Sequence, residues 1–269
     1  MLDIPEAMET RIHEALDECE RSEDVVVCLA VESGSRAWGF PSKDSDFDVR
    51  FLYVRRPEWY LSIDLEERRD VIERPLEGGL DLSGWDLRKA LRLFRKSNPP
   101  LMEWLQCSLI YREQFSVAKR LRALLPRTYS QRAAYFHYLH MAEGNFREYL
   151  RGETVWLKKY LYVLRPLMAV RWIERGNGPV PIEFKSLVDG TIQDANVREA
   201  IARLVAAKAA GAELDRGPRV EAISSFIESE FDRLASAEVS AASTGPDADA
   251  LNELFREAVY EVWSPSRSA

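Results

Sequence analysis

The sequence predicts an α+β fold in which a small mixed-sheet domain is followed by a helical domain. Two apolar runs near the N-terminus have the length of buried strands, and Gly78-Gly79 joins two more in a hairpin pattern. Beyond these runs, apolar residues recur almost entirely at helical spacing. We therefore expect domains at 1–110 and 111–269. The predicted strands are residues 25–31, 46–54, 70–75 and 80–85.

The helices are predicted from apolar spacing and from residues that start or stop a helix. Pro5 suits a first helical turn, and Ile12, Leu16 and Cys19 then recur on one face. A Gly- and Pro-rich break at 176–181 ends the longest helical stretch. Residues 34–38 should form a turn and a short helical segment, and 235–249 a flexible linker. The predicted helices are residues 5–22, 86–96, 99–107, 113–125, 130–151, 154–175, 194–210, 219–236 and 249–262.

Composition indicates a globular protein of the reducing cytoplasm. The 269 residues are 46% hydrophobic and 30% charged, which is ordinary for such proteins. No apolar stretch approaches a membrane span, and the acidic N-terminus has no signal-peptide core. The three cysteines show no paired spacing and fit buried apolar positions. We therefore expect a cytoplasmic location and no membrane partner.

Charge is distributed unevenly along the chain. Residues 86–172 contain 17 Lys and Arg against 6 Asp and Glu, a net +11, so the remainder carries −18 of the overall −7. The overall charge argues against a protein that coats nucleic acid. The basic middle segment could hold a triphosphate or the backbone of an RNA or DNA end, although solvated helix faces account for such charge equally well.

Two carboxylates follow a Gly-Ser turn between the first two strands. Strand side chains alternate, so Asp46 and Asp48 should point to the same face. Adjacent carboxylates repel each other unless a cation lies between them, and Mg²⁺ is commonly held by one or two carboxylates plus substrate phosphates. Gly34 lets backbone N–H groups approach a phosphate, and Ser35 adds a donor. An isolated Asp-x-Asp is usually a solvated surface feature, but the turn and the two flanking strands make this pattern more specific.

The same residues resemble a known family. Gly-Ser followed by Asp-hydrophobic-Asp resembles the nucleotidyltransferase superfamily that includes DNA polymerase beta. The longer pattern resembles its YcgL/RlaP-type members, named for a presumed role in RNA repair, over roughly residues 25–185. The matching segments are 34–39 (GSRAWG), 44–51 (DSDFDVRF), 84–91 (GWDLRKAL), 96–99 (KSNP) and 157–167 (LKKYLYVLRPL).

The resemblance implies a nucleotidyltransferase domain followed by a helical domain that binds nucleotide or acceptor. The implied reaction moves a nucleoside monophosphate from an NTP to an acceptor hydroxyl, with Mg²⁺ as cofactor and Mn²⁺ as a substitute. Asp46 and Asp48 would bind the metal, and Gly34 and Ser35 would hold the phosphates. An RNA end is one acceptor; a protein or a small molecule is the alternative, and a catalytically inactive nucleotide-binding module is another.

A two-metal transfer site normally includes a third acid. Asp81, between Leu80 and Leu82, resembles the superfamily's third position, where the acid helps hold the catalytic metal or accepts the proton of the attacking hydroxyl. Asp86 competes for this role, but it precedes a predicted helix and suits an N-cap. We therefore favour Asp81 as the third catalytic and metal-binding carboxylate.

Basic and aromatic residues elsewhere are candidates for nucleotide binding. Arg36 could reach the phosphates or clamp Asp44 or Asp46. Lys158, Tyr162 and Arg165 recur at i, i+4 and i+7 on one predicted helix face, which could grip triphosphate oxygens or could be an ordinary basic surface. The resemblance favours Lys158 or Lys159 for the phosphates and Tyr162 or Tyr160 for stacking on the base.

Overall fold

The computed structural model describes residues 4–211, 214–236 and 248–264, which form two compact units. Within these residues, unit 1 comprises 4–37, 46–129 and 248–264, and unit 2 comprises 38–45, 130–211 and 214–236. The α+β class predicted from the sequence is confirmed. The unit division differs from a boundary at residue 110 because a strand and two helices beyond that residue pack with the N-terminal sheet.

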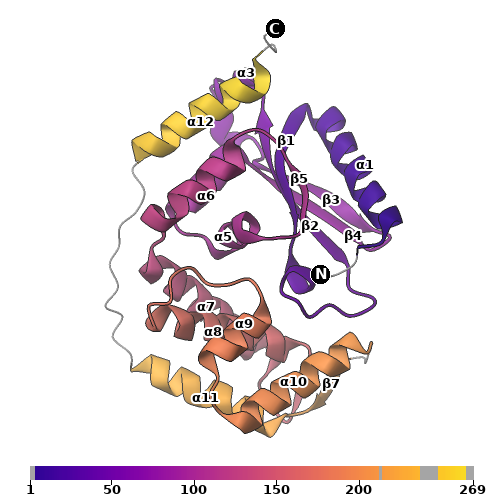
Figure 1. Cartoon of the computed structure of the whole chain (residues 1–269), viewed down its shortest axis with the longest axis vertical. Coiled ribbons are helices and arrows are strands. Elements are labelled where there is room, and N and C mark those ends of the chain that lie inside the picture. The colour runs from indigo at the N-terminus through magenta and orange to yellow at the C-terminus, as the bar shows by residue number, and fades with distance from the viewer. Residues whose placement is uncertain (1–3, 212–213, 237–247, 265–269) are drawn as a thin grey trace. The chain divides into compact units, whose positions relative to one another are not determined.

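Unit 1 is built on a five-stranded mixed sheet with the order β3-β4-β2-β1-β5 (Figure 1). All pairings are antiparallel except that of β2 with β4, which is parallel. Gly78 and Gly79, both at positive φ, form the predicted turn between β3 and β4. The strands are β1 Val25–Glu32, β2 Phe47–Arg55, β3 Val71–Glu77, β4 Leu80–Asp86 and β5 Ile110–Glu113.

Helix α1 (Glu6–Glu23) covers one face of this sheet, and further helices of unit 1 cover the other (Figure 1). Ile12, Leu16 and Cys19 of α1 are fully buried against alternate sheet residues, including Phe47 and Val49 of β2. The intervening residues of β2 therefore point away from α1. The remaining helices of unit 1 are α2 Gly34–Ala37, α3 Pro57–Tyr60, the 3₁₀ turn η1 Leu65–Glu67, α4 Leu87–Arg95, α5 Pro99–Gln106, α6 Val117–Thr128 and α12 Ala248–Trp263.

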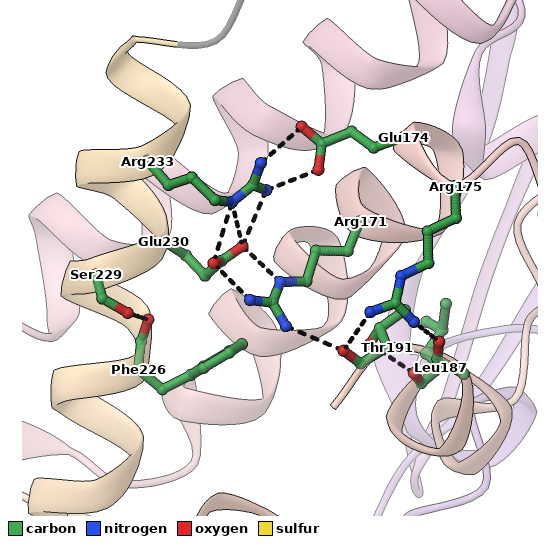
Figure 2. Close-up of polar contacts among 10 residues, drawn as sticks. Arg171, Glu174, Arg175, Leu187, Thr191, Phe226, Ser229, Glu230 and Arg233 are labelled. Carbon is green, nitrogen blue, oxygen red and sulfur yellow. Dashed lines mark hydrogen bonds and ion pairs between the residues drawn. The ribbon is translucent and has the colours of Figure 1, made fainter. Parts of the chain in front are cut away.

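Unit 2 is helical and is organised around α8, most of whose residues are buried. Figure 2 shows how an ion-pair network joins α8 to α11: Glu230 accepts hydrogen bonds from both Arg171 (2.6 Å) and Arg233 (3.1 Å), and Arg233 also binds Glu174 (2.7 Å). Burial alone would raise the pKa of Glu230, but the two guanidiniums outweigh it and hold that pKa below its usual range. The elements are α7 Gln131–Tyr149, β6 Thr154–Trp156, α8 Lys159–Glu174, α9 Phe184–Thr191, α10 Ala195–Ala209, β7 Arg216–Pro218 and α11 Glu221–Ala235.

Several predicted elements differ from the observed ones. The helix expected at 113–125 begins at Val117, because residues 110–113 instead pair with β1 as the edge strand β5. The helix expected at 154–175 begins at Lys159, because Thr154–Trp156 pairs with β7. Helix α9 was not predicted. Residues 237–247 of the predicted linker lie outside the described residues. No helix in the described part of the chain has the length and apolar character needed to cross a membrane.

Candidate active site

The parallel pairing of β2 and β4 brings Asp48 and Asp81 together. The two residues are direct partners in the register, so their side chains leave the same face of the sheet, the face opposite α1. Asp46 lies just before β2, beside the β3–β4 turn, where Phe47 donates its N–H to the carbonyl of Gly79 (2.7 Å). The three acids named from the sequence therefore all lie at the N-terminal ends of β2 and β4, in unit 1.

Arg50 lies between two of these acids and was not among the predicted residues. Its Nη2 donates to Asp48 Oδ1 (3.1 Å) and to Asp81 Oδ2 (2.6 Å). Burial raises the pKa of Asp48; Arg50 opposes this shift, and the charges of Asp81 and Asp46 add to it. Burial is the largest of these effects, so Asp48 is a partly desolvated carboxylate with charged groups of both signs beside it.

The Gly-Ser turn touches this cluster directly. Gly34 begins α2 at a φ of +58°, and a Cβ at this position would lie 2.1 Å from Asp48 Oδ2. Only glycine leaves room for the carboxylate and also adopts this φ without strain. Ser35 is 7% exposed. Arg36 donates from Nε to the carbonyl of Asp46 (3.2 Å), and its guanidinium stacks on the ring of Phe47 at 3.7 Å.

A buried carboxylate behind the cluster also escaped prediction. Glu32 is 1% exposed and ends β1; its Oε1 accepts the N–H of Asp48 (2.9 Å), and its Oε2 accepts the hydroxyl of Tyr111. Burial raises the pKa of Glu32, and these two hydrogen bonds oppose the shift. The available sequence signal was an acid directly after the apolar residues 25–31, but the predicted strand ended one residue too early to include it.

Asp86, the competitor for the third acid, lies at the opposite end of β4. It caps α4 by accepting the N–H of Arg88 (2.8 Å), and it also accepts the hydroxyl of Tyr60 (2.7 Å). Burial raises the pKa of Asp86 to about 6. The predicted N-cap is therefore present, and four residues of strand separate Asp86 from Asp81.

Two of the predicted nucleotide-binding residues of α8 contact Trp38. Arg165 is buried, with its guanidinium 4.5 Å from the centre of the Trp38 ring, and Tyr162 contacts the same ring edge-on at 5.6 Å. Tyr160 instead contacts Ser224 of α11 (2.6 Å) through its hydroxyl. Trp38, within the GSRAWG segment, is therefore a residue of this cluster that the sequence analysis did not single out.

The two lysines lie at the start of α8. Lys158 precedes the helix and is exposed, whereas the ammonium of Lys159 lies 4.0 Å from the ring centre of Tyr149. Burial and the neighbouring Lys158 lower the pKa of Lys159. All these residues belong to unit 2 and the carboxylates to unit 1, so a shared nucleotide site stays a prediction.

The residues present are compatible with a Mg²⁺ ion that also binds substrate phosphates. Asp46 and Asp48 offer hard oxygen ligands, and one or two carboxylates suffice when phosphate and water complete the coordination. Across residues 4–211, 214–236 and 248–264, no group of three or more His, Cys, Asp or Glu side chains is gathered closely enough to hold a metal alone. Asp48 and Asp81 both pair with the guanidinium of Arg50.

The Gly-Ser turn and the acids Asp46, Asp48 and Asp81, on which the resemblance to polymerase beta-like nucleotidyltransferases was based, all lie in unit 1 of the structure. The comparison with family profiles agrees: the chain belongs to the RNA repair pathway DNA polymerase beta family, whose profile matches residues 8–257.

One relative and one solved structure are similar to this chain. The chain is 45% identical over 262 residues to "Uncharacterized protein YcgL" of Bacillus subtilis (strain 168), covering 97% of this chain and 100% of that protein. A nucleotidyltransferase-like protein from Exiguobacterium sibiricum 255-15 is 14% identical, with a TM-score of 0.32 over 94% of this chain and 76% of that one. The TM-score is too low for the second similarity to support a structural argument.

Proposed function

We propose that this protein is a Mg²⁺-dependent nucleotidyltransferase that moves a nucleoside monophosphate from an NTP to an acceptor hydroxyl, with an RNA end as the acceptor. The main observation that supports this proposal is that Asp48 and Asp81 are partners in the register of β2 and β4, beside the turn at Gly34. Family membership supports the reaction class. The basic segment 86–172 supports an acceptor with a phosphate backbone.

Asp46 and Asp48 are the residues that would hold Mg²⁺, and Mn²⁺ would serve in its place. When bound, the ion supplies positive charge that neutralises the triphosphate and favours departure of pyrophosphate. Gly34 and Ser35 are the proposed holders of the outer phosphates, because backbone N–H groups of a glycine-containing turn are suited to bind anions.

Asp81 is the proposed acceptor of the proton from the attacking hydroxyl. The oxygen of that hydroxyl forms a bond to the α-phosphorus while the bond from the α-phosphorus to the bridging oxygen breaks, and pyrophosphate leaves. Positioning and charge neutralisation supply most of the catalysis in such a transfer. Lys158, Lys159, Tyr162 and Arg165 are the proposed contributors of unit 2 to nucleotide binding.

The test is incubation with each α-³²P-labelled NTP and Mg²⁺ over a panel of RNA ends. The inactive control is Asp46→Ala/Asp48→Ala. Asp81→Asn and Asp86→Asn form a matched pair on one strand: we expect the first to lose transfer and the second to keep it. Label on RNA with the wild type alone supports the proposal.

Two results would contradict it. Transfer to no RNA end, with nucleotide binding intact, would exclude the RNA acceptor and direct the search to protein and small-molecule acceptors. Equal transfer by the wild type and the Asp46→Ala/Asp48→Ala variant would exclude the proposed site itself.

A further inference from the structure

Arg50 is anchored on the sheet between two carboxylates that the superfamily pattern assigns to metal binding. It lies on β2 two residues after Asp48, so its side chain leaves the same face of the sheet as that of Asp48. Its Nη2 contacts Asp48 Oδ1 at 3.1 Å and Asp81 Oδ2 at 2.6 Å. The guanidinium thus bridges one acid from each of the two parallel strands.

The position of this guanidinium is held by the backbone as well. Nη1 of Arg50 donates to the carbonyls of Val49 and Asp81, each at 3.2 Å. The Arg50 side chain is only 20% exposed, and both carboxylates are also partly shielded from water, at 28% and 36%. Exposed ion pairs are often loose and weak, whereas a guanidinium that makes four hydrogen bonds to two strands is a fixed element of the site.

A fixed guanidinium changes the number of cations that the acids need. In a two-metal site, the second ion is held between acids that the first ion does not satisfy alone. Here the guanidinium of Arg50, in contact with both Asp48 and Asp81, already supplies the pair with a positive charge that is not lost, because an arginine keeps its proton in a protein. Among the hydrogen bonds and ion pairs of the described residues, Arg50 contacts Asp48 and Asp81 but not Asp46, so the charge of Asp46 is left for a divalent ion.

We propose that Arg50 takes the place of the second metal ion, so that each active chain uses one divalent ion, held by Asp46 and Asp48 together with the triphosphate. The inference rests on the proposed function, because it assumes a nucleotide with a metal at this site. It makes Arg50 part of the catalytic machinery: its charge neutralises Asp48 and Asp81 where the acceptor hydroxyl and the α-phosphate meet.

The test counts Mn²⁺ ions by equilibrium dialysis at saturating non-hydrolysable NTP analogue, with the metal bound by free analogue subtracted from a protein-free chamber. We expect one ion per chain for the wild type and two for Arg50→Gln, in which a neutral amide leaves the space between the acids uncompensated. Arg50→Lys, which keeps the charge, should bind one. Arg112→Gln is the matched control, because Arg112 also bridges two acids of unit 1, Asp17 (2.6 Å) and Glu20 (3.1 Å), away from the site.

The outcomes separate this inference from the proposed function. Two ions on the wild type would overturn the role of Arg50 and leave the metal-dependent function standing. One ion on both the wild type and Arg50→Gln would also overturn it, because removal of the charge would then not open a second site. No ion on the wild type would refute the metal-dependent function, and the inference with it. If Arg50→Gln does not fold, two ions on the wild type would still overturn the inference.

Discussion

Replacement of Glu32 tests whether the buried carboxylate behind the cluster positions Asp48. Glu32 is 1% exposed, and its two oxygens accept the backbone N–H of Asp48 (2.9 Å) and the hydroxyl of Tyr111. Glu32→Ala would leave both donors buried without these acceptors. Glu32→Gln keeps an oxygen for Asp48 and offers an amide donor to the hydroxyl oxygen of Tyr111, so the two variants differ in hydrogen bonding while both remove the charge.

The magnitude follows from the two lost acceptors. A buried donor left without a partner costs about 1–3 kcal/mol, so Glu32→Ala should lower the free energy of unfolding by roughly 2–6 kcal/mol. Asp48 would lose the acceptor of its backbone N–H, and a displacement of a catalytic group by about 1 Å costs roughly 10²-fold in rate. Glu32→Gln should stay within about 1.5 kcal/mol of the wild type, the net value of one ordinary hydrogen bond.

Two assays measure these effects: urea unfolding for stability, and transfer from α-³²P-labelled NTP at saturating nucleotide for the rate. Tyr111→Phe is the matched control, because it removes one hydrogen bond to Glu32 and leaves that to Asp48. We expect it to lose stability without the large loss of rate. The reasoning is refuted if Glu32→Ala transfers nucleotide at the wild-type rate, or if Glu32→Gln is as inactive as Glu32→Ala.

Three further predictions concern other parts of the chain. Gly34→Ala should reduce transfer by about 10²-fold, because the new Cβ would lie 2.1 Å from Asp48 Oδ2. Gly176→Ala is the matched control: Gly176 has a similar φ, +68° against +58°, but no neighbour within 4 Å, so this variant should keep full activity. Asp86→Asn should flatten the dependence of stability on pH between about 4 and 6. The folded-state pKa of Asp86, about 6, lies above its ordinary 3.8, so the contribution of Asp86 to the free energy of unfolding is complete below pH 3.8 and is lost as the pH rises through 6. Urea unfolding should show that the wild type loses at most about 3 kcal/mol of stability from this residue over that range. Glu230→Gln should destabilise the protein by about 3–5 kcal/mol in thermal unfolding, because it leaves two guanidiniums without their shared counter-charge. Since the pKa of Glu230 is held low, this contribution is present at neutral pH and lost as the pH falls below about 4.5; a melting temperature within about 2 °C of the wild type would contradict it.

Local sequence patterns were sufficient for most helices and for the hairpin of β3 and β4. Helix boundaries depend on nearby residues, and the cap at Asp86 lies where its sequence position indicates. The edge strand β5 was missed because a four-residue strand has almost no periodicity of its own, and it forms because β1 offers it a partner. The short strands β6 and β7 were missed for the same reason.

The sequence by itself determined the fold class and the placement of Asp46 and Asp48 after a Gly-Ser turn, because strand alternation and turn chemistry are local properties of the chain. Only the tertiary structure decided which neighbours these acids have. The parallel pairing of β2 with β4 places Asp81 beside Asp48 and allows Arg50 to bridge them, and the end of β1 brings Glu32 to the backbone of Asp48. β2 and β4 are not consecutive along the chain, so their pairing depends on burial over the whole sheet, and no local turn or pattern specifies it.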